Sequence, residues 1–383
     1  MKIIYCTHST CNPGGMERVL LNKVTYLSQL PGWKVAVVTT DQNQRPPFYP
    51  FPEKVRMTDL GINYSEDNGK GAWKRSMEKI TGYLRKRKEH KRKLTALLLK
   101  EKPDIVVSLY PSESSFIPDI KDGSKKVLEL HYCKFFRLQY GRRGLLGWID
   151  KLRTRQDEQI VRRFDKFVVL TNEDRGYWGN LPNIEVIPNA AMHVSDAYSD
   201  VMNKRVIAVG RLDYQKGFDR LVQAWQLVRH TGKFTDWKLD IFGQGEWREM
   251  LQQMIDKAEL QDSVRLNRPT KQIGEEYVKS DMLVMSSNYE GFPMVMIEAM
   301  ACGLPVVSFD YKCGPKDIIQ PGINGLLVPN GDIQALADAM MKVMEDEAYR
   351  KMLSLNARKV VDTYSEQAVM SQWIRLFTSI TAK

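Results

Sequence analysis

Residues 282–305, MLVMSSNYEGFPMVMIEAMACGLP, combine a strand, a loop and a helix. The apolar run Met282–Met285 is typical of a buried strand. Pro293 and Gly303 stand where a helix commonly begins and where it has just ended. A loop that contains Gly291 joins the two elements. The stretch therefore predicts one β–loop–α unit of a parallel sheet that is covered by helices.

The same alternation of short apolar runs and longer helical patterns extends in both directions from this stretch. It pauses near Ile184–Ala191 and in the polar residues 195–204, and then it starts again. We predict an α/β protein with two doubly wound domains, residues 1–190 and 191–365. The predicted strands are Lys2–Tyr5, Trp33–Thr39, Asp104–Ser108, Lys125–His131, Lys166–Leu170, Arg205–Val209, Lys238–Phe242, Val264–Leu266, Met282–Met285 and Val306–Phe309.

The composition is that of an ordinary globular protein. The chain has 383 residues, of which 43% are hydrophobic and 27% are charged. No apolar run approaches the roughly 20 residues of a membrane span, and the start of the chain predicts no signal peptide. The cysteines are scattered and form no CxxC pair, which favours a reducing, cytoplasmic setting and argues against a cysteine zinc site. They are Cys6, Cys11, Cys133, Cys302 and Cys313.

Positive charge is concentrated in the first half of the chain. Residues 1–190 hold 34 basic and 21 acidic residues, whereas the remainder holds 23 and 25. Residues 70–102 alone hold 13 basic and 3 acidic residues. A solvated helix, an anionic membrane surface and nucleic acid are three possible explanations of this basic stretch. Nucleic acid is the least favoured, because aromatic residues are sparse in the run.

Ligands of open α/β sheets bind beyond the carboxyl ends of the strands, so the loops at those ends are the first places to look for a site. Gly14 and Gly15 follow the first strand, where they allow either close approach of a ligand or only a tight turn. Arg211 and Lys216 flank the loop after the strand Arg205–Val209. A lysine at the start of a helix opposes the helix dipole, which indicates a bound anion unless both cations are simply solvated.

Two further positions carry ionisable side chains near predicted strand ends. Glu298 falls within an apolar helix, where a carboxylate is costly unless sugar or ribose hydroxyls, or a core arginine, provide a partner. His131 ends the strand Lys125–His131, and both a structural and a catalytic role remain open for it. The sequence has no Asp-x-Asp cluster after a strand, no P-loop and no GxSxG elbow, so we expect no metal site.

Taken together, these segments resemble the GT-B glycosyltransferases, specifically the large retaining family 4. The resemblance covers nearly the whole chain and is most specific in its second half. It rests on residues 290–305, EGFPMVMIEAMACGLP, with Glu290 and Glu298 eight positions apart. The other matching segments, in order, are Gly14-Gly15, His131, Ile187-Pro188-Asn189, Gly210-Arg211 with Lys216-Gly217, and Asn324–Pro329. The resemblance implies two Rossmann-like domains that face a central cleft, with a last helix, about 366–383, that packs back on the first domain.

The resemblance also implies a role for each matching residue. Arg211 and Lys216 would hold the donor diphosphate, Glu298 would accept hydrogen bonds from the ribose, and Glu290 would contact the transferred sugar. His131 would contact that sugar from the first domain. The remaining implied substrate-binding residues are Gly14 and Gly15, which let the backbone approach the phosphate and acceptor, and Gly291, Phe292, Pro293, Met294 and Val295, which follow Glu290.

The activity implied is retaining transfer of a hexose or N-acetylhexosamine, without a metal or other cofactor. UDP is favoured as the donor nucleotide because of the Glu290–Pro293 and Cys313–Pro315 segments. The expected acceptor is a lipid-linked sugar or polysaccharide of an envelope glycan, reached on the inner face of the cytoplasmic membrane through residues 70–102. One alternative is a soluble sugar or sugar-phosphate acceptor. Another is a basic protein that binds nucleic acid, which would not need the paired Arg/Lys and Glu/Glu residues.

Overall fold

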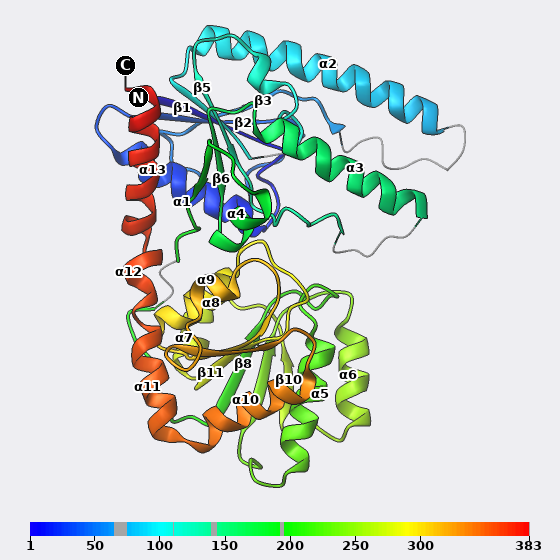
Figure 1. Ribbon diagram of the computed structural model, residues 1–383, viewed down its shortest axis with the longest axis vertical. Coiled ribbons are helices and arrows are strands. Elements are labelled where there is room, and N and C mark those ends of the chain that lie inside the picture. Colours follow the sequence, from blue (N-terminus) through cyan, green and yellow to red (C-terminus); the bar gives the residue numbers. More distant parts are fainter. Residues whose placement is uncertain (65–74, 110, 139–143, 192–194, 383) are drawn as a thin grey trace. The chain divides into compact units, whose positions relative to one another are not determined.

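The computed structural model describes residues 1–64, 75–109, 111–138, 144–191 and 195–382. They form two compact units, each built on its own parallel sheet (Figure 1). The first unit contains Met1–Val169, Trp178–Ile187 and Met370–Lys383, and the second contains Leu170–Tyr177 and Pro188–Val369. The chain thus passes between the units more than once. The sequence pattern does not indicate that Leu170–Tyr177 joins the second unit, or that the final return to the first unit comes at Met370 and not at residue 366.

The sheet of the first unit has the strand order β3-β2-β1-β4-β5-β6-β7, and all of its strands are parallel. Five of these strands match predicted ones, whereas β3 and β7 were not predicted. β3 is polar and lies at the sheet edge, so it lacks the apolar run that identifies a buried strand. The bounds are β1 Lys2–Thr7, β2 Lys34–Thr39, β3 Arg56–Asp59, β4 Ile105–Ser108, β5 Lys125–Glu129, β6 Lys166–Val169 and β7 Ile184–Val186.

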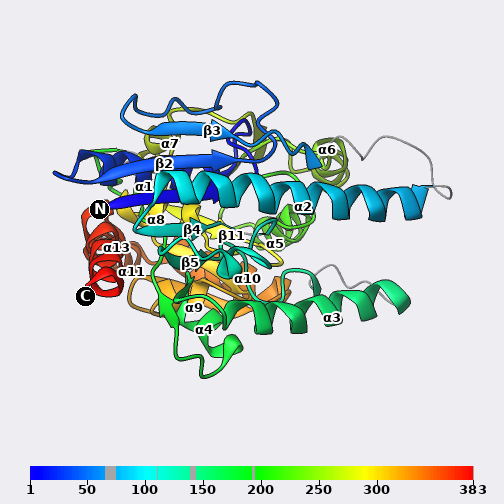
Figure 2. The same ribbon diagram turned by 90° about the horizontal axis from the view of Figure 1, so that it is seen from above.

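The main helices of the first unit are α1, α2, α3 and the last helix, α13. Figures 1 and 2 show the N-terminal halves of α2 and α3 extending past the sheet on the same side. The predicted basic helix corresponds to α2, and residues 70–74 of the basic stretch lie outside the described residues. The bounds are α1 Gly15–Gln29, α2 Arg75–Glu101, α3 Gly144–Val161 and α13 Glu366–Thr381, with a short 3₁₀ helix at Ile117–Asp119. The helix α4, Asn172–Trp178, follows β6 and belongs almost wholly to the second unit.

The sheet of the second unit has the order β10-β9-β8-β11-β12-β13 and is also parallel throughout. Its strands are β8 Arg205–Val209, β9 Lys238–Phe242, β10 Val264–Asn267, β11 Met282–Met285, β12 Val306–Asp310 and β13 Gly325–Pro329. Its helices are α5 Phe218–His230, α6 Arg248–Lys257, α7 Ile273–Val278, α8 Met294–Ala301, α9 Pro315–Ile318, α10 Ile333–Glu345, α11 Glu347–Ala357 and α12 Val360–Tyr364. α10 packs against α5, and the fully buried Trp225 of α5 lies in the core.

The strand order shows where each unit can hold a ligand. In both sheets the strands are added in one direction and then in the other, so the order reverses between β1 and β4 in the first unit and between β8 and β11 in the second. Loops that leave neighbouring strands at such a switch point diverge to opposite faces, which leaves a crevice beyond the strand ends. The predicted α/β class with two doubly wound domains is confirmed.

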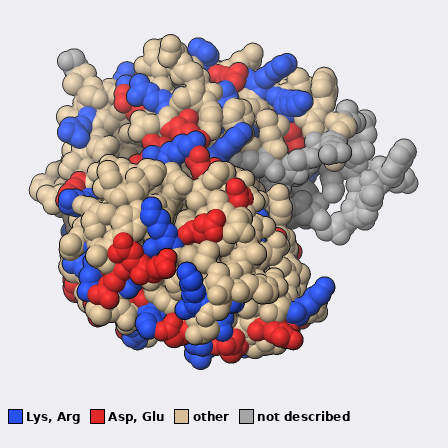
Figure 3. All heavy atoms as spheres, turned by 60° about the horizontal axis from the view of Figure 1, so that its bottom comes forward, with Lys and Arg blue, Asp and Glu red and all other residues tan. Residues whose placement is uncertain are grey.

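The surface and the helices add two observations. Among the described residues, no helix is both long and apolar enough to cross a bilayer. Figure 3 shows basic and acidic side chains intermixed over the face that it draws. This mixture agrees with the nearly balanced charge of residues 191–383, which hold 23 basic and 25 acidic residues.

Candidate active site

The second unit brings together two loops at its switch point. The loop after β8 carries Arg211 and Lys216, and the loop after β11 carries Glu290. Nζ of Lys216 lies 2.6 Å from Oε1 of Glu290, and both side chains are largely buried, with exposed fractions of 13% and 7%. The hydroxyl of Ser287 donates to the same carboxylate oxygen at 2.8 Å. The two loops are therefore joined by an ion pair that sits at the carboxyl edge of the sheet.

Gln215 extends this pair to Arg211. Its amide nitrogen donates to Oε2 of Glu290 at 3.0 Å, and its amide oxygen accepts from Arg211 at 2.7 Å. Arg211 also lies 3.2 Å from Asp213, and its side chain remains 69% exposed. Gln215 and Ser287 were not predicted as site residues, because a neutral side chain beside a charged one carries no signal of its own in the sequence. The result is a continuous polar chain from an exposed guanidinium to a buried ammonium.

Backbone geometry explains why the loop after β8 can place Lys216 there. A side chain at Gly210 would collide with the aliphatic stem of Lys216, whose Cε lies 2.7 Å from the position of the missing Cβ. Gly217 has a φ of 59°, and a Cβ there would lie 2.5 Å from the carbonyl oxygen of Ser286. Ser286 in turn donates to the carbonyl of Lys216 at 3.0 Å, and Arg220 donates to the carbonyl of Ser286. Glycine at 217 thus allows the two loops to approach closely, and glycine at 210 leaves room for the Lys216 side chain within its own loop.

The helix α8 shows which of the predicted substrate-binding residues reach the surface. Phe292 is 8% exposed and packs in the core beside Tyr364, so its side chain is not available to a ligand. Pro293 is also buried, whereas Gly291, Met294 and Val295 are partly exposed. At the start of α8 the amides of Met294 and Met296 already donate to the carbonyls of Phe292 and Pro293, so the segment presents to a ligand mainly its partly exposed residues.

The side chain of Glu298 is more exposed to solvent than the apolar sequence around it predicts. Its side chain is half-buried, and it lies near enough to Cys302, one turn further along α8, to act on that thiol. Burial and the charge of Glu298 together raise the pKa of Cys302 to about 11. The carboxylate therefore lies on the partly accessible side of α8 and not within the core.

The first unit holds the other predicted positions. Gly14 caps α1, and a side chain there would meet the carboxylate of Glu17, whose Oε2 lies 2.0 Å from the missing Cβ. Gly15 has open space on its side-chain side and is exposed. His131 lies two residues beyond the end of β5, with Nε2 3.2 Å from Oε1 of Glu129. Its side chain is 7% exposed, so the ring is held within the unit.

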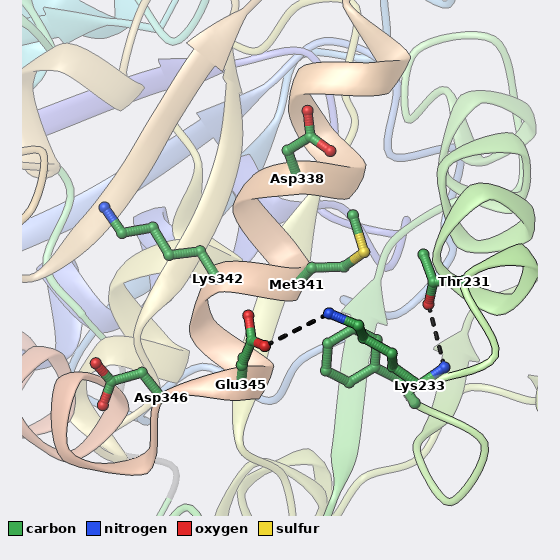
Figure 4. A pocket seen from close by; sticks show the side chains of 8 residues that line it. Thr231, Lys233, Asp338, Met341, Lys342, Glu345 and Asp346 are labelled. Carbon is green, nitrogen blue, oxygen red and sulfur yellow. Dashed lines mark hydrogen bonds and ion pairs between the residues drawn. The ribbon is translucent and has the colours of Figure 1, made fainter.

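A surface pocket of about 630 Å³ lies elsewhere in the second unit, between the end of α5 and α10 (Figure 4). It carries side chains of both signs, and Lys233 pairs with Glu345 across it at 3.8 Å. It is found at the end of α5 and before the start of β9, which is the amino edge of the sheet and opposite to Lys216. We assign no function to it, because its charged side chains are solvent-exposed and of both signs.

The second-unit loops have the chemistry of a site for an anionic, hydroxyl-rich ligand. Arg211 and Lys216 supply positive charge at the start of α5, and Glu290 and Glu298 supply hydrogen-bond acceptors around α8. Two cations can hold a diphosphate and stabilise charge that develops on it, while carboxylates bind sugar hydroxyls.

Comparisons with known proteins define the class. The family model of the group 1 glycosyl transferases matches residues 196–360, and that of glycosyltransferase family 4 matches residues 13–191. The two models together cover most of the chain and both of its units. The chain belongs to the family 4, group 1, glycosyltransferases, and its fold is GT-B.

Individual relatives cover the chain to different extents. An exopolysaccharide phosphotransferase of Streptomyces coelicolor is 31% identical over 61% of this chain and 26% of its own length. The amylovoran biosynthesis glycosyltransferase AmsD of Erwinia amylovora is 35% identical over 55% of this chain and 61% of its own length. The matches thus span about a quarter and about three-fifths of these two proteins. The crystal structure of Anabaena HepE with UDP and glucose matches with a TM-score of 0.72 at 17% identity, over 99% of this chain and 100% of that one.

Proposed function

We propose that this chain is a retaining glycosyltransferase that moves a hexose or N-acetylhexosamine from a nucleotide sugar, with UDP favoured, to a lipid-linked or polysaccharide acceptor of an envelope glycan. The observation that carries the proposal is the ion pair of Lys216 and Glu290 at the switch point of the second sheet. Arg211 is linked to that pair through Gln215. The pair sets a cation beside a carboxylate, and this supports a site in which the cation binds a diphosphate and the carboxylate accepts hydrogen bonds from a sugar.

Each charged residue has a distinct role in this proposal. Lys216 and Arg211 bind the diphosphate and stabilise the charge that it gains as the bond to the sugar breaks. Their two positive charges take the part that a divalent cation plays in other enzymes, and we propose that the reaction needs no metal. Glu290 accepts hydrogen bonds from the transferred sugar, and Glu298 accepts them from the ribose. In the first unit, His131 contacts the transferred sugar.

The donor and acceptor classes take support from the relatives. The names of the Streptomyces and Erwinia proteins refer to exopolysaccharide and to amylovoran, and the Anabaena structure contains UDP and glucose. A soluble sugar or sugar-phosphate acceptor is the alternative. A requirement for a lipid-linked or polymeric acceptor in the transfer reaction distinguishes the two.

Contact with an anionic membrane forms the last part of the proposal. Exposed basic residues on α2, Arg85, Lys88, Lys91 and Arg92, lie on the same helix as the exposed Tyr83 and Leu84. Basic side chains attract anionic lipid, and partly inserted apolar side chains add to such binding. Lys86 and Arg87 are bound to the body of the unit, since they donate to the carbonyl of Asn63 at 2.6 Å and to Ser115 at 2.9 Å.

A panel of UDP-, GDP- and ADP-sugars tests the proposal directly, with EDTA present throughout. We expect a UDP-sugar to raise the melting temperature most, since a ligand that binds only the folded state stabilises it. Transfer to a lipid-linked acceptor is then followed, and the anomeric configuration of the product is determined by NMR. A product of inverted configuration would refute retention, and a strict need for added Mg²⁺ would refute the metal-free mechanism.

A further inference from the structure

A buried carboxylate in the first unit serves two basic partners at once. Glu129 is the last residue of β5 and is fully buried. Its Oε1 contacts the ammonium of Lys23 and lies 3.2 Å from Nε2 of His131. Burying a carboxylate is costly unless it is paired and hydrogen-bonded, so this arrangement stabilises the ionised form.

Lys23 is itself held in place by a residue from the last helix. It lies in the middle of α1, and its side chain is 5% exposed. Its Nζ lies 3.8 Å from the centre of the Trp373 ring of α13, which is a cation–π contact. Burial lowers the pKa of Lys23, and Glu129 acts against that change. Three segments that are distant in sequence, α1, β5 and α13, therefore meet at Lys23.

Glu129 remains ionised at neutral pH. Burial by itself would raise its pKa, but Lys23 and His131 outweigh burial and lower the pKa to about 2. An ionised carboxylate accepts hydrogen bonds and donates none, so the nitrogen of His131 that faces it must carry a hydrogen. In the neutral ring the other nitrogen, Nδ1, is then an acceptor.

The contacts exceed what a purely structural ion pair needs. Lys23 alone would balance the charge of Glu129, yet a second contact is made to a residue just beyond the strand end, where ligands bind in such sheets. Oε1 takes both contacts, while Oε2 is buried and has no hydrogen-bond partner among the residues that the structure describes. Glu129 thus contacts His131 although one of its own carboxylate oxygens lacks a hydrogen bond.

We propose that Glu129, held by Lys23, positions His131 and fixes its neutral ring as the Nε2–H tautomer, so that Nδ1 accepts a hydrogen bond from a hydroxyl of the transferred sugar. Glu129 and Lys23 are positioning residues, since they act through His131. The role of Nδ1 toward a sugar rests on the proposed function, whereas the tautomer does not. Two further titratable groups lie near the cluster: burial raises the pKa of Glu17 and of Tyr5, and the charge of Glu129 raises that of Tyr5 further.

The test is NMR of the full chain with ¹⁵N-labelled histidine at a pH where the ring is neutral. The ring signals of His131 are assigned by their loss in His131→Gln. We expect the parent to show the Nε2–H tautomer. In the double variant Lys23→Met with Glu129→Leu, both charges are replaced by apolar groups of similar size, which avoids an unpaired buried charge. We expect this variant to show a mixture of the two tautomers.

The double variant Lys126→Met with Asp122→Asn is the matched control, because Lys126 is a buried lysine of the same unit whose ion pair is with the buried Asp122. It should leave the His131 signals unchanged, although it also removes a buried pair. An Nδ1–H tautomer in the parent would overturn the proposal. Parent-like His131 signals in the folded double variant would overturn it as well.

Kinetics then separate this proposal from the proposed function. With Lys216 and Arg211 untouched, the double variant Lys23→Met with Glu129→Leu should bind UDP as the parent does and lose about two- to tenfold in kcat, because only the Nε2–H share of the ring presents Nδ1 as an acceptor and the ring is no longer held in place. An unchanged kcat would refute the role of Nδ1 while leaving transferase activity in place. Absence of transfer in the parent would refute the proposed function, and the NMR result would still decide the tautomer.

Discussion

The two sheets share a strand order, but the charged side chains at their carboxyl edges differ in how they connect to solvent. In the second unit, Lys216 and Glu290 are 13% and 7% exposed and are linked through Gln215 to Arg211, which is 69% exposed. In the first unit, Lys23 and Glu129 are 5% and 0% exposed, and only His131 continues from them toward the strand end. The second unit thus keeps charges where a charged ligand can reach them. In the first unit, the buried charges of Lys23 and Glu129 instead hold the ring of His131.

The largest effect that would test this contrast is expected at Lys216. Lys216→Ala should lower kcat by about 10²–10³-fold, or about 2.7–4 kcal/mol, by analogy with the loss of one group that stabilises transition-state charge. Arg211→Ala should cost less, because its exposed guanidinium is better screened by solvent. Steady-state kinetics measure both effects. Lys233→Ala, an exposed lysine of the pocket in Figure 4, is the control and should retain parental kcat.

The next effect separates the two carboxylates of the second unit. Glu298→Ala should weaken binding of free UDP and of the UDP-sugar alike, by about 1.5–3 kcal/mol for a lost bond to a charged acceptor. Glu290→Ala should instead lower the rate of sugar transfer more than the affinity for UDP. Isothermal titration with UDP, combined with kinetics, distinguishes the two. An equal loss of UDP affinity in both variants would contradict the assigned roles.

In the first unit, Glu113 should make stability depend on pH. Burial raises its pKa from 4.5 to about 7, although Ser108 donates a hydrogen bond to it. The folded state therefore holds a proton that the unfolded state releases at a lower pH, so the free energy of unfolding falls as pH rises from 4.5 to 7. The fall amounts to at most about 3 kcal/mol. Urea denaturation should show that Glu113→Gln removes this part of the pH dependence.

The smallest effect per residue is expected on α2. Replacing Arg85, Lys88, Lys91 and Arg92 by glutamine should weaken binding to anionic vesicles by about 1 kcal/mol per charge, most clearly at low salt. Hydrolysis of the donor by water should not change, since these residues lie outside both loops of the second unit. Lys86 and Arg87 are left intact because they bind the body of the unit. Parental binding to vesicles would refute the membrane contact.

The second unit was the easier one to predict, for a physical reason. Arg211, Lys216, Glu290 and Glu298 lie in two short stretches, and each stretch follows a strand with a clear apolar pattern. Strand order then brings the two loops together. What the sequence could not show was the bridge through Gln215, because the partner of an amide depends on where the other loop crosses the sheet.

The first unit was harder to predict, because its contacts join residues that are far apart in the sequence. Lys23 looks like one more solvated lysine of an amphipathic helix, and its partner Glu129 is 106 positions away. Trp373 comes from the far end of the chain. The edge strand β3 was not predicted, because its polar residues lack the apolar run of a central strand. Only the folded structure brings such residues together.

The last helix also imposes an order on biosynthesis. Trp373 and Phe377 are 1% and 0% exposed, and Phe377 packs against Trp33 of the first unit at 6.5 Å between ring centres. Residues 1–169 leave the ribosome long before these two aromatic residues are made, so the first unit must wait for the whole second unit before its core is complete. Partly folded chains of this kind expose apolar surface and are prone to aggregate. Until the chain through residue 377 has been made, a nascent first unit therefore exposes the apolar surface that the last helix later covers.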